Sequence, residues 1–444
     1  MSTQTASTPL AGAEARRAAR NAATMAVARI ISSGTLFLWS LILGKLLGEF
    51  DLGIYGTINA LYGIGVAITA FSMSQIVIRD VARQPNLAGK YLSTTLVLQT
   101  LFALLAYVIL NAAARALGYD ESLRALTAVA CISLFIDMAG NMCYDQLLAQ
   151  ERMVPTALLE LGHVVVRIAL AGLALWAGFG LLGIYAVTLF TGSLRSVLLW
   201  IMLLRTGVRP SFPVNWAIAR PLLINSAPLA LSSFINITYI RIDQLMTTSL
   251  LTHADTGHLT LAFFFVSGVI EILSTTVLIA IYPMMSRAYR PGSDDNATFF
   301  FMVEKLSFFT LLIGVPLGLL FTRFSTDIIV PLFGENYHAT ADILHTLIWY
   351  TVTTMVVNVF SQATMVQNRQ RFYVAVRAGG LTLKLVLNLL LLPRIGVVGA
   401  ALASVTAEIL VLALLSSTFH LHWNTLSPRL FKLAGVALLS GAAM

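Results

Sequence analysis

The sequence is a succession of long apolar stretches separated by short polar segments. A helix needs about 20 mainly apolar residues to cross a bilayer. Twelve stretches are that long, and each predicts one transmembrane helix. They lie near residues 24–44, 53–78, 91–112, 125–149, 157–178, 181–204, 222–250, 259–284, 304–322, 341–367, 372–392 and 396–419. The polar segments between them are too short to hold a catalytic domain outside the membrane.

A thirteenth apolar stretch begins near residue 430 and runs to Met444. It is shorter than a span, so we expect it either to lie in the membrane interface or to continue in a longer chain. In the second case the number of spans is thirteen or fourteen.

Composition narrows the class of protein further. Residues of the AVILMFWYC set make up 58% of the 444 residues, and Asp, Glu, Lys and Arg only 11%. A soluble domain carries about 25% charged residues. The composition therefore excludes a soluble enzyme and a disordered chain, and two cysteines exclude a disulfide framework. We predict an all-α integral membrane protein.

The distribution of basic residues predicts the orientation. With the N-terminus in the cytoplasm, sixteen Lys and Arg residues of the loops and terminal tails lie inside and five lie outside. Cytoplasmic loops of membrane proteins carry such an excess. It also accounts for the net charge of +8, which therefore does not indicate nucleic acid as a partner. Residues 1–23 are expected to form a cytoplasmic tail, and the first span to be uncleaved.

Two pairs of short motifs indicate an internal duplication. Asp51-x-Gly53 lies between spans one and two, and Asp255-x-Gly257 lies between spans seven and eight. The strings GLLG (180–183) and GVVG (396–399) open spans six and twelve. A duplication of six helices predicts an N-terminal lobe at 24–204, a cytoplasmic linker at 205–221, a C-terminal lobe at 222–420 and a tail at 421–444. Both lobes would have the same orientation in the membrane.

Several charged residues lie inside the predicted spans, where a charge is costly unless it faces water or another charge. The basic candidates for a substrate cavity are Arg29, Arg167, Arg241 and Lys384. For the deep ones an internal ion pair is the alternative, and Arg29 is equally compatible with reaching the cytoplasm. Arg377 lies near a span end and is expected to reach the interface.

The acidic residues of the spans are candidates for ion coupling or for pairing. There are six, namely Asp137, Asp145, Glu160, Asp243, Glu271 and Glu408, and the ion-coupling candidates among them are Glu160, Asp243, Glu271 and Glu408. Arg241 and Asp243 are two residues apart and point to different sides of their helix, so each needs its own partner. Glu271 and Glu408 are either those partners or cation sites. Glu160 forms a polar stripe with His163 and Arg167 at helical spacing, and Arg377, Lys384 and Asn388 share one face of span eleven.

An interior with several deep arginines suits an anionic cargo, because guanidinium binds phosphate in a bidentate manner. The sequence has no GxxxxGK[ST] phosphate loop, no HExxH or Cys/His metal site and no GxSxG nucleophile. We therefore expect a transporter rather than an enzyme, with no cofactor, no metal and no ATP hydrolysis of its own.

Five local strings resemble one family of membrane proteins. They are LGKLLGEFDLGIYG (43–56), SQIVIRDVAR (74–83), IRIDQL (240–245), LFGENYHATADIL (332–344) and LPRIGVVGAALASV (392–405). In order and spacing they are similar to the polysaccharide-biosynthesis flippases of the MATE-like (MOP) superfamily. Arg79 matches the usual arginine at the end of the second span. Lys45 stands where arginine is common, and residues 252–265 lack the G-x-Y-x-x-A pattern of the family.

The resemblance implies two six-helix lobes around a central cavity. It implies flipping of oligosaccharides linked to polyprenyl diphosphate across the cytoplasmic membrane, for O-antigen, capsule or exopolysaccharide export. Arg29, Arg79, Arg167, Arg241 and Lys384 would bind the diphosphate or sugar, and ion-coupled alternating access would drive transport. Membrane lipids and a polysaccharide polymerase or chain-length machinery are the expected partners.

Three other functions remain open at this point. A MATE-type drug antiporter should have a mostly acidic interior, and this sequence has deep arginines. A flippase for the peptidoglycan precursor lipid II is not separated by the sequence. A glycosyl polymerase or ligase acting on the same lipid usually has a large external loop, which this sequence lacks.

Overall fold

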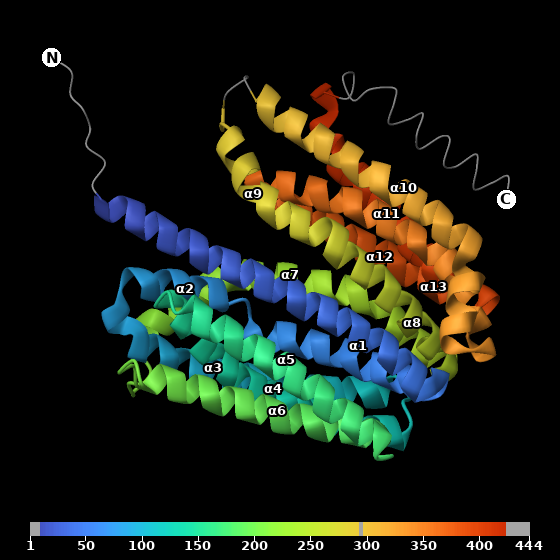
Figure 1. Ribbon diagram of the computed structural model, residues 1–444, viewed down its shortest axis with the longest axis horizontal. Coiled ribbons are helices and arrows are strands. Elements are labelled where there is room, and N and C mark those ends of the chain that lie inside the picture. The colour runs from blue at the N-terminus through green and yellow to red at the C-terminus, as the bar shows by residue number, and fades with distance from the viewer. Residues whose placement is uncertain (1–8, 293–295, 423–444) are drawn as a thin grey trace. The chain divides into compact units, whose positions relative to one another are not determined.

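The computed structural model describes residues 9–292 and 296–422, and the regular elements in these ranges are all helices (Figure 1). The α-helices are α1 (Pro9–Ala70), α2 (Ser74–Arg83), α3 (Ala88–Ala116), α4 (Glu121–Ala149), α5 (Met153–Trp176), α6 (Gly180–Leu204), α7 (Trp216–Leu250), α8 (His253–Ile270), α9 (Thr276–Ala288), α10 (Ala297–Phe333), α11 (His338–Val366), α12 (Gln370–Ile395) and α13 (Val398–Ser416). Short 3-10 segments are η1 (Pro85–Leu87), η3 (Glu335–Tyr337) and η4 (Ser417–His422), and η2 (Glu271–Thr275) is a π-helix. The predicted all-α architecture is confirmed.

Ten helical stretches of the described chain are long and apolar enough to cross a membrane. The chain is thus a multi-pass membrane protein. One of the ten, Ile31–Arg83, contains most of the first predicted span and all of the second. Helices α8 and α9, which cover the predicted span 259–284, are not among the ten. The count of twelve and the cytoplasmic N-terminus stay predictions. Of the expected tails, residues 1–8 and 423–444 lie outside the described residues, and α1 already begins at Pro9.

The first predicted span and most of the second lie in the 62-residue helix α1, with a break at Gly48. Gly48 has φ 71° and ψ 171°, which is not helical. Glycine adopts a positive φ at little cost because it has no Cβ. The chain therefore turns at Gly48, within the polar segment that separates the two predicted spans.

The second span ends earlier than the sequence predicts. It was expected to continue to residue 78, but α1 ends at Ala70. Phe71 (φ 44°) and Ser72 (φ 49°) have left-handed backbone conformations, which interrupt the helix. The short amphipathic helix α2 follows and buries Ile76, Val77 and Val81. The prediction of one continuous span over 53–78 is wrong for this reason.

The chain forms two compact units. Unit 1 contains Met1–Leu36, Ile68–Val108 and Val129–Ala230, and unit 2 contains Phe37–Ala67, Ile109–Ala128 and Leu231–Met444. The predicted division into lobes at residues 205–221 stays a prediction, as does the central cavity.

Unit 1 is built around α5 and α6, which pack against each other, and around two apolar clusters. One cluster fixes α2 and contains Met73, Ile76, Val77, Val81, Ala88 and Leu222. The other joins α3, α4 and α6 through Leu92, Met142, Cys143, Leu147, Leu199 and Leu203. The outer faces of α5 and α6 expose large apolar side chains such as Leu173 and Phe190, as a surface in contact with lipid does.

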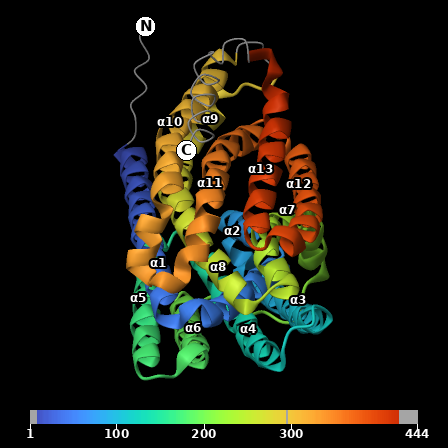
Figure 2. The ribbon, with the colours of Figure 1, turned by 90° about the vertical axis from the view of Figure 1, so that its right-hand side faces the viewer.

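Unit 2 is organised around α11, against which α8, α10 and α13 pack. Figure 2 shows α11 between α10 and α13, with α12 beside α13. The largest apolar cluster joins α7, α8, α11 and α13 and includes Tyr239, Leu259, Leu344 and Ala407. This packing places polar residues of α7, α12 and α13 in the same interior.

Candidate functional site

A fully buried ion pair joins α7 to α12 in unit 2. Lys384 Nζ lies 2.7 Å from Asp243 Oδ2, and both side chains have no exposed surface. Asn388 donates to Asp243 Oδ1 at 2.7 Å, and Ser404 of α13 donates to Oδ2 at 2.5 Å. Lys384 and Asn388 are four residues apart and therefore lie on one face of α12. The carboxylate of Asp243 is thus satisfied by three side chains from two other helices, α12 and α13.

A second buried ion pair lies two turns away on the same face of α12. Arg377 Nη1 is 3.2 Å from Glu408 Oε2 of α13, and Glu408 is fully buried. The Tyr239 hydroxyl donates to the same oxygen at 2.6 Å. The Tyr239 carbonyl in turn accepts a hydrogen bond from Lys384 at 2.9 Å. Tyr239 therefore connects the two pairs.

Both cations lie close to the aromatic ring of Tyr239. The guanidinium of Arg377 is 5.1 Å from the ring centroid, and the ammonium of Lys384 is 4.7 Å from it. Cations at such distances from an aromatic face are stabilised by its quadrupole. We name the set Tyr239, Asp243, Arg377, Lys384, Asn388, Ser404 and Glu408 the paired network. Its two positive and two negative charges cancel.

Arg241 lies on α7 between Tyr239 and Asp243 but outside the paired network. Its side chain is partly buried, and its Nε is buried without a hydrogen-bond partner among the described residues. This Nε lies 3.8 Å from the position that a Cβ on Gly63 would take. No carboxylate within residues 9–292 and 296–422 forms an ion pair with Arg241. An unpaired guanidinium in this position is suited to bind an anion.

Unit 1 contains a smaller charged cluster on α4, α5 and α6. Arg195 lies 2.7 Å from Glu160 and donates to Asn141 at 2.9 Å. His163 follows Glu160 by one turn, and its Nε2 is buried without a partner among the described residues. Arg167 is partly buried and makes no hydrogen bond or ion pair with the part of the chain that the structure describes. Asp137 of α4 lies beside the same part of α6, since its Oδ1 is 3.6 Å from the position that a Cβ on Gly192 would take. The region therefore holds at least two carboxylates beside its two arginines.

The remaining sequence candidates lie apart from these clusters. Arg79 on α2 is 52% exposed and lies 2.8 Å from Asp80, which also accepts from Tyr91 at 3.1 Å. Glu271 opens the π-helix η2 and is partly buried. The side chain of Arg29 lies outside the described residues. Among the described residues, no group of three His, Cys, Asp or Glu side chains could hold a metal ion.

The structure changes several of the expected pairings. The expectation that Arg377 reaches the interface is wrong, because it is 6% exposed and paired with Glu408. Glu408 is therefore not the partner of Arg241 or Asp243. The prediction that Arg377, Lys384 and Asn388 share one face is confirmed, since all three are buried in the same network.

Sequence reasoning missed two members of the network. Tyr239 and Ser404 carry no charge, so they were not singled out among apolar neighbours. The available signal was their spacing, since Tyr239 precedes Asp243 by four residues and Ser404 precedes Glu408 by four.

These features define an integral membrane protein with the fold of the MOP-superfamily transporters. A structure of the lipid II flippase MurJ in an inward closed conformation has a TM-score of 0.74 at 14% identity, covering 94% of this chain and 91% of that chain. An inward-facing multidrug resistance MATE family transporter has a TM-score of 0.71 at 15% identity, covering 90% and 98%. A MOP superfamily transporter from Pyrococcus furiosus has a TM-score of 0.54 at 17% identity, covering 90% and 95%.

The chain belongs to the polysaccharide biosynthesis protein family, whose model matches residues 42–342. The family resemblance stated from the five sequence strings is therefore confirmed. The solved structures are similar in fold, and they are of transporters and a flippase. No curated protein matches the sequence of this chain.

Proposed function

We propose that the protein flips oligosaccharides linked to polyprenyl diphosphate across the cytoplasmic (inner) cell membrane. Arg241 is the observation that carries the proposal. It has a buried donor without a partner, whereas the cations of the paired network each have a carboxylate. A diphosphate carries the charge and the acceptor oxygens that such a guanidinium lacks.

The paired network holds Arg241 in place. Tyr239 and Asp243 are four residues apart on one face of α7, and both are tied to α12 and α13. Arg241 lies between them and points to the opposite face. Because the network fixes α7, the guanidinium is oriented before the substrate arrives, which reduces the ordering cost of binding.

We infer a role for Lys384 and Asp243 that differs from the one first expected. Lys384 was a candidate for diphosphate binding and Asp243 for ion coupling, but each neutralises the other. Removing one charge of a buried pair costs about 3–5 kcal/mol because the partner stays buried and uncompensated. We therefore assign Asp243, Lys384 and Glu408 to positioning, and Arg241 with Arg167 to the substrate. Arg29, Arg79, ion coupling through Glu271 or Glu160, and partnership with a polymerase stay predictions.

Lipid II is the second candidate substrate, since the solved structure with TM-score 0.74 is of a lipid II flippase. Its diphosphate would suit Arg241 equally well. A cationic drug is disfavoured, because the buried acids Asp243 and Glu408 already hold basic side chains.

The substrate class can be tested with reconstituted protein. Proteoliposomes carrying fluorescent undecaprenyl-diphosphate oligosaccharide, fluorescent lipid II or a cationic dye are compared side by side. An impermeant reductant quenches only the outer leaflet, so flipping appears as loss of the protected half of the lipid. We expect the sugar lipid to be flipped and the dye to be excluded. Faster flipping of lipid II would select the second candidate, and dye uptake without lipid flipping would refute both.

A further inference from the structure

At one end of unit 2, α1 and α8 cross at glycines, with no side chains between them. A Cβ on Gly53 would overlap the carbonyl oxygen of His253, and a Cβ on Gly257 would overlap that of Glu49. The relation is reciprocal, because each glycine lies against the carbonyl four residues before the other. These are the glycines of the two Asp-x-Gly motifs, which the structure brings into contact.

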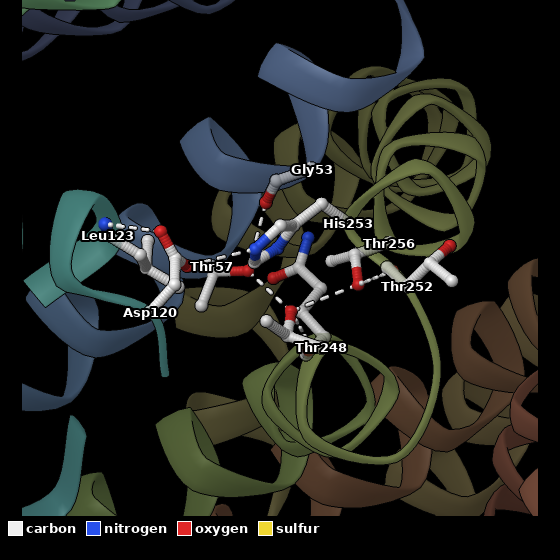
Figure 3. A network of polar contacts seen from close by, with 9 residues as sticks. Gly53, Thr57, Asp120, Leu123, Thr248, Thr252, His253 and Thr256 are labelled. Carbon is white, nitrogen blue, oxygen red and sulfur yellow. Dashed lines mark hydrogen bonds and ion pairs between the residues drawn. The ribbon is translucent and has the colours of Figure 1, made fainter. Parts of the chain in front are cut away.

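A chain of buried threonines extends this crossing to α7. Thr57 Oγ1 donates to the Gly53 carbonyl at 2.9 Å and lies 2.5 Å from Thr248 Oγ1 (Figure 3). Thr248 in turn lies 3.0 Å from Thr256 Oγ1 of α8. Thr57 is fully buried and Thr248 is 7% exposed. The three helices are therefore closed against solvent at this end.

The turn between α3 and α4 lies over this closed end. Asp120 Oδ1 is 3.1 Å from His253 Nε2, and the Tyr119 hydroxyl donates to the Leu245 carbonyl at 3.2 Å. Burial raises the pKa of Tyr119 to about 12, so its hydroxyl stays protonated. Burial also raises the pKa of Asp120, but hydrogen bonds from the Leu123 amide and from His253 outweigh it and lower the pKa below its usual value. Asp120 is thus held as an anion facing His253.

The contact of Asp120 with His253 is more exposed to solvent than the glycine and threonine contacts beneath it. Asp120 is 49% exposed and His253 is 18% exposed, whereas the glycine and threonine contacts are buried. Exposed pairs of this kind contribute little and break readily. Helices α3 and α4 also belong mainly to unit 1, and only Ile109–Ala128 clusters with unit 2. The turn is therefore attached to α7 and α8 at one place while the rest of both helices belongs elsewhere.

We propose that the α3–α4 turn holds a gate closed at this end of the transport path. The contact between Asp120 and His253 breaks when the gate opens. The sequence places the segments between α3 and α4 and between α7 and α8 outside the cell, so the gate is the exit for the cargo. The inference rests on the proposed function, since a gate presupposes transport. Asp120 and His253 act here as positioning residues and do not touch the cargo.

The gate can be tested by the accessibility of a buried thiol. In a variant with Cys131→Ala and Cys143→Ala, which removes both native cysteines, Thr248→Cys reports on the glycine and threonine contacts beneath the contact of Asp120 with His253. The protein is placed in nanodiscs, where both faces are open to a water-soluble maleimide. Because an exposed contact of this kind contributes about 1 kcal/mol, we expect Asp120→Ala and His253→Ala to raise the labelling rate about fivefold. Thr57→Cys serves as a second reporter.

A matched control and a swap make the test specific. Glu121→Ala removes the next carboxylate along the chain, which forms no ion pair with the described residues, and should leave the labelling rate unchanged. The double variant Asp120→His/His253→Asp exchanges the carboxylate and the imidazole and so keeps the contact between them. Its labelling rate should return to within about twofold of that of the parent. Equal labelling of Asp120→Ala and the parent with both reporters, or no recovery in the swap, would overturn the gate. Labelling needs no transported lipid, so failure of the proposed function would show separately as absent flipping in the parent.

Discussion

The buried charges on the two faces of α7 differ in whether they have a partner. On one face Asp243 is enclosed by Lys384, Asn388 and Ser404, and every charge has a partner. On the other face Arg241 has a buried Nε with no partner among the described residues. Removing one partner of a buried pair leaves the other charge uncompensated, whereas an unpaired charge has a cost that a ligand can remove. The comparison therefore separates residues that position the site from the residue that binds.

The largest expected effect is on the paired face. Lys384→Met leaves Asp243 charged and uncompensated in the interior, which should cost about 3–5 kcal/mol in folding stability. The melting temperature of the purified protein in detergent measures it. Adding Asp243→Asn should recover most of the loss, because the second change removes the uncompensated charge. A Lys384→Met protein as stable as the parent would show that the pair does not hold α7.

The second prediction concerns the crossing of α1 and α8 at Gly53 and Gly257, where added volume rather than a removed charge is expected to destabilise the protein. Gly257→Ala inserts a methyl group against the carbonyl of Glu49, and overpacking of this kind costs about 1–3 kcal/mol. Gly379→Ala in α12 is the matched control, since nothing lies within 4 Å of its position. We expect the control to be neutral or stabilising by about 0.5–1 kcal/mol. Equal melting temperatures for the two variants would contradict the close crossing.

A smaller effect is expected in unit 1. Glu160→Gln removes the carboxylate that pairs with Arg195, but Arg195 still donates a hydrogen bond to Asn141, and Glu160 is 30% exposed. Solvent screening reduces the contribution of such a pair to about 1 kcal/mol. Thermal unfolding should therefore shift less than in Lys384→Met. A shift as large as that of Lys384→Met would indicate that the unit 1 cluster is as closed as the paired network.

The smallest effect concerns Arg79. Its guanidinium is half-exposed and pairs with the neighbouring Asp80, so Arg79→Ala should leave the melting temperature unchanged. If Arg79 also stays away from the cargo, the flipping rate is unchanged too. Loss of flipping with normal stability would instead restore Arg79 to the substrate site, as the family resemblance first implied.

The sequence predicted the helices better than it predicted which charged side chains pair with each other. The spans follow from apolar length, and the shared face of Arg377, Lys384 and Asn388 follows from helical period. Which helix lies opposite that face depends on the packing of α7, α12 and α13, which no local pattern encodes. For this reason the pairing of Lys384 with Asp243 and of Arg377 with Glu408 was not predicted. The end of α1 at Ala70 was missed because the turn there is formed by Phe71 and Ser72, and neither is a glycine or proline that would signal a turn.

The Asp-x-Gly motifs were recognised in the sequence, but their structural role was not. They were noticed as a repeat, and their spacing indicated only a duplication. The structure places Gly53 and Gly257 against each other's helices, so the repeated glycine is explained by a close crossing. The repeat was visible in the sequence, but the contact was not.

The most direct test of the account is the flipping rate of Arg241→Ala compared with Lys305→Ala. Both changes remove one cation from a membrane-spanning helix, but Lys305 is exposed and lies over the ring of Phe301. With fluorescent undecaprenyl-diphosphate oligosaccharide in proteoliposomes, Arg241→Ala should lose at least about tenfold in rate while keeping its melting temperature, since a charge-assisted hydrogen bond contributes about 1.5–3 kcal/mol. Lys305→Ala should flip at the parent rate. Normal flipping by Arg241→Ala would contradict the claim that the unpaired guanidinium binds the cargo.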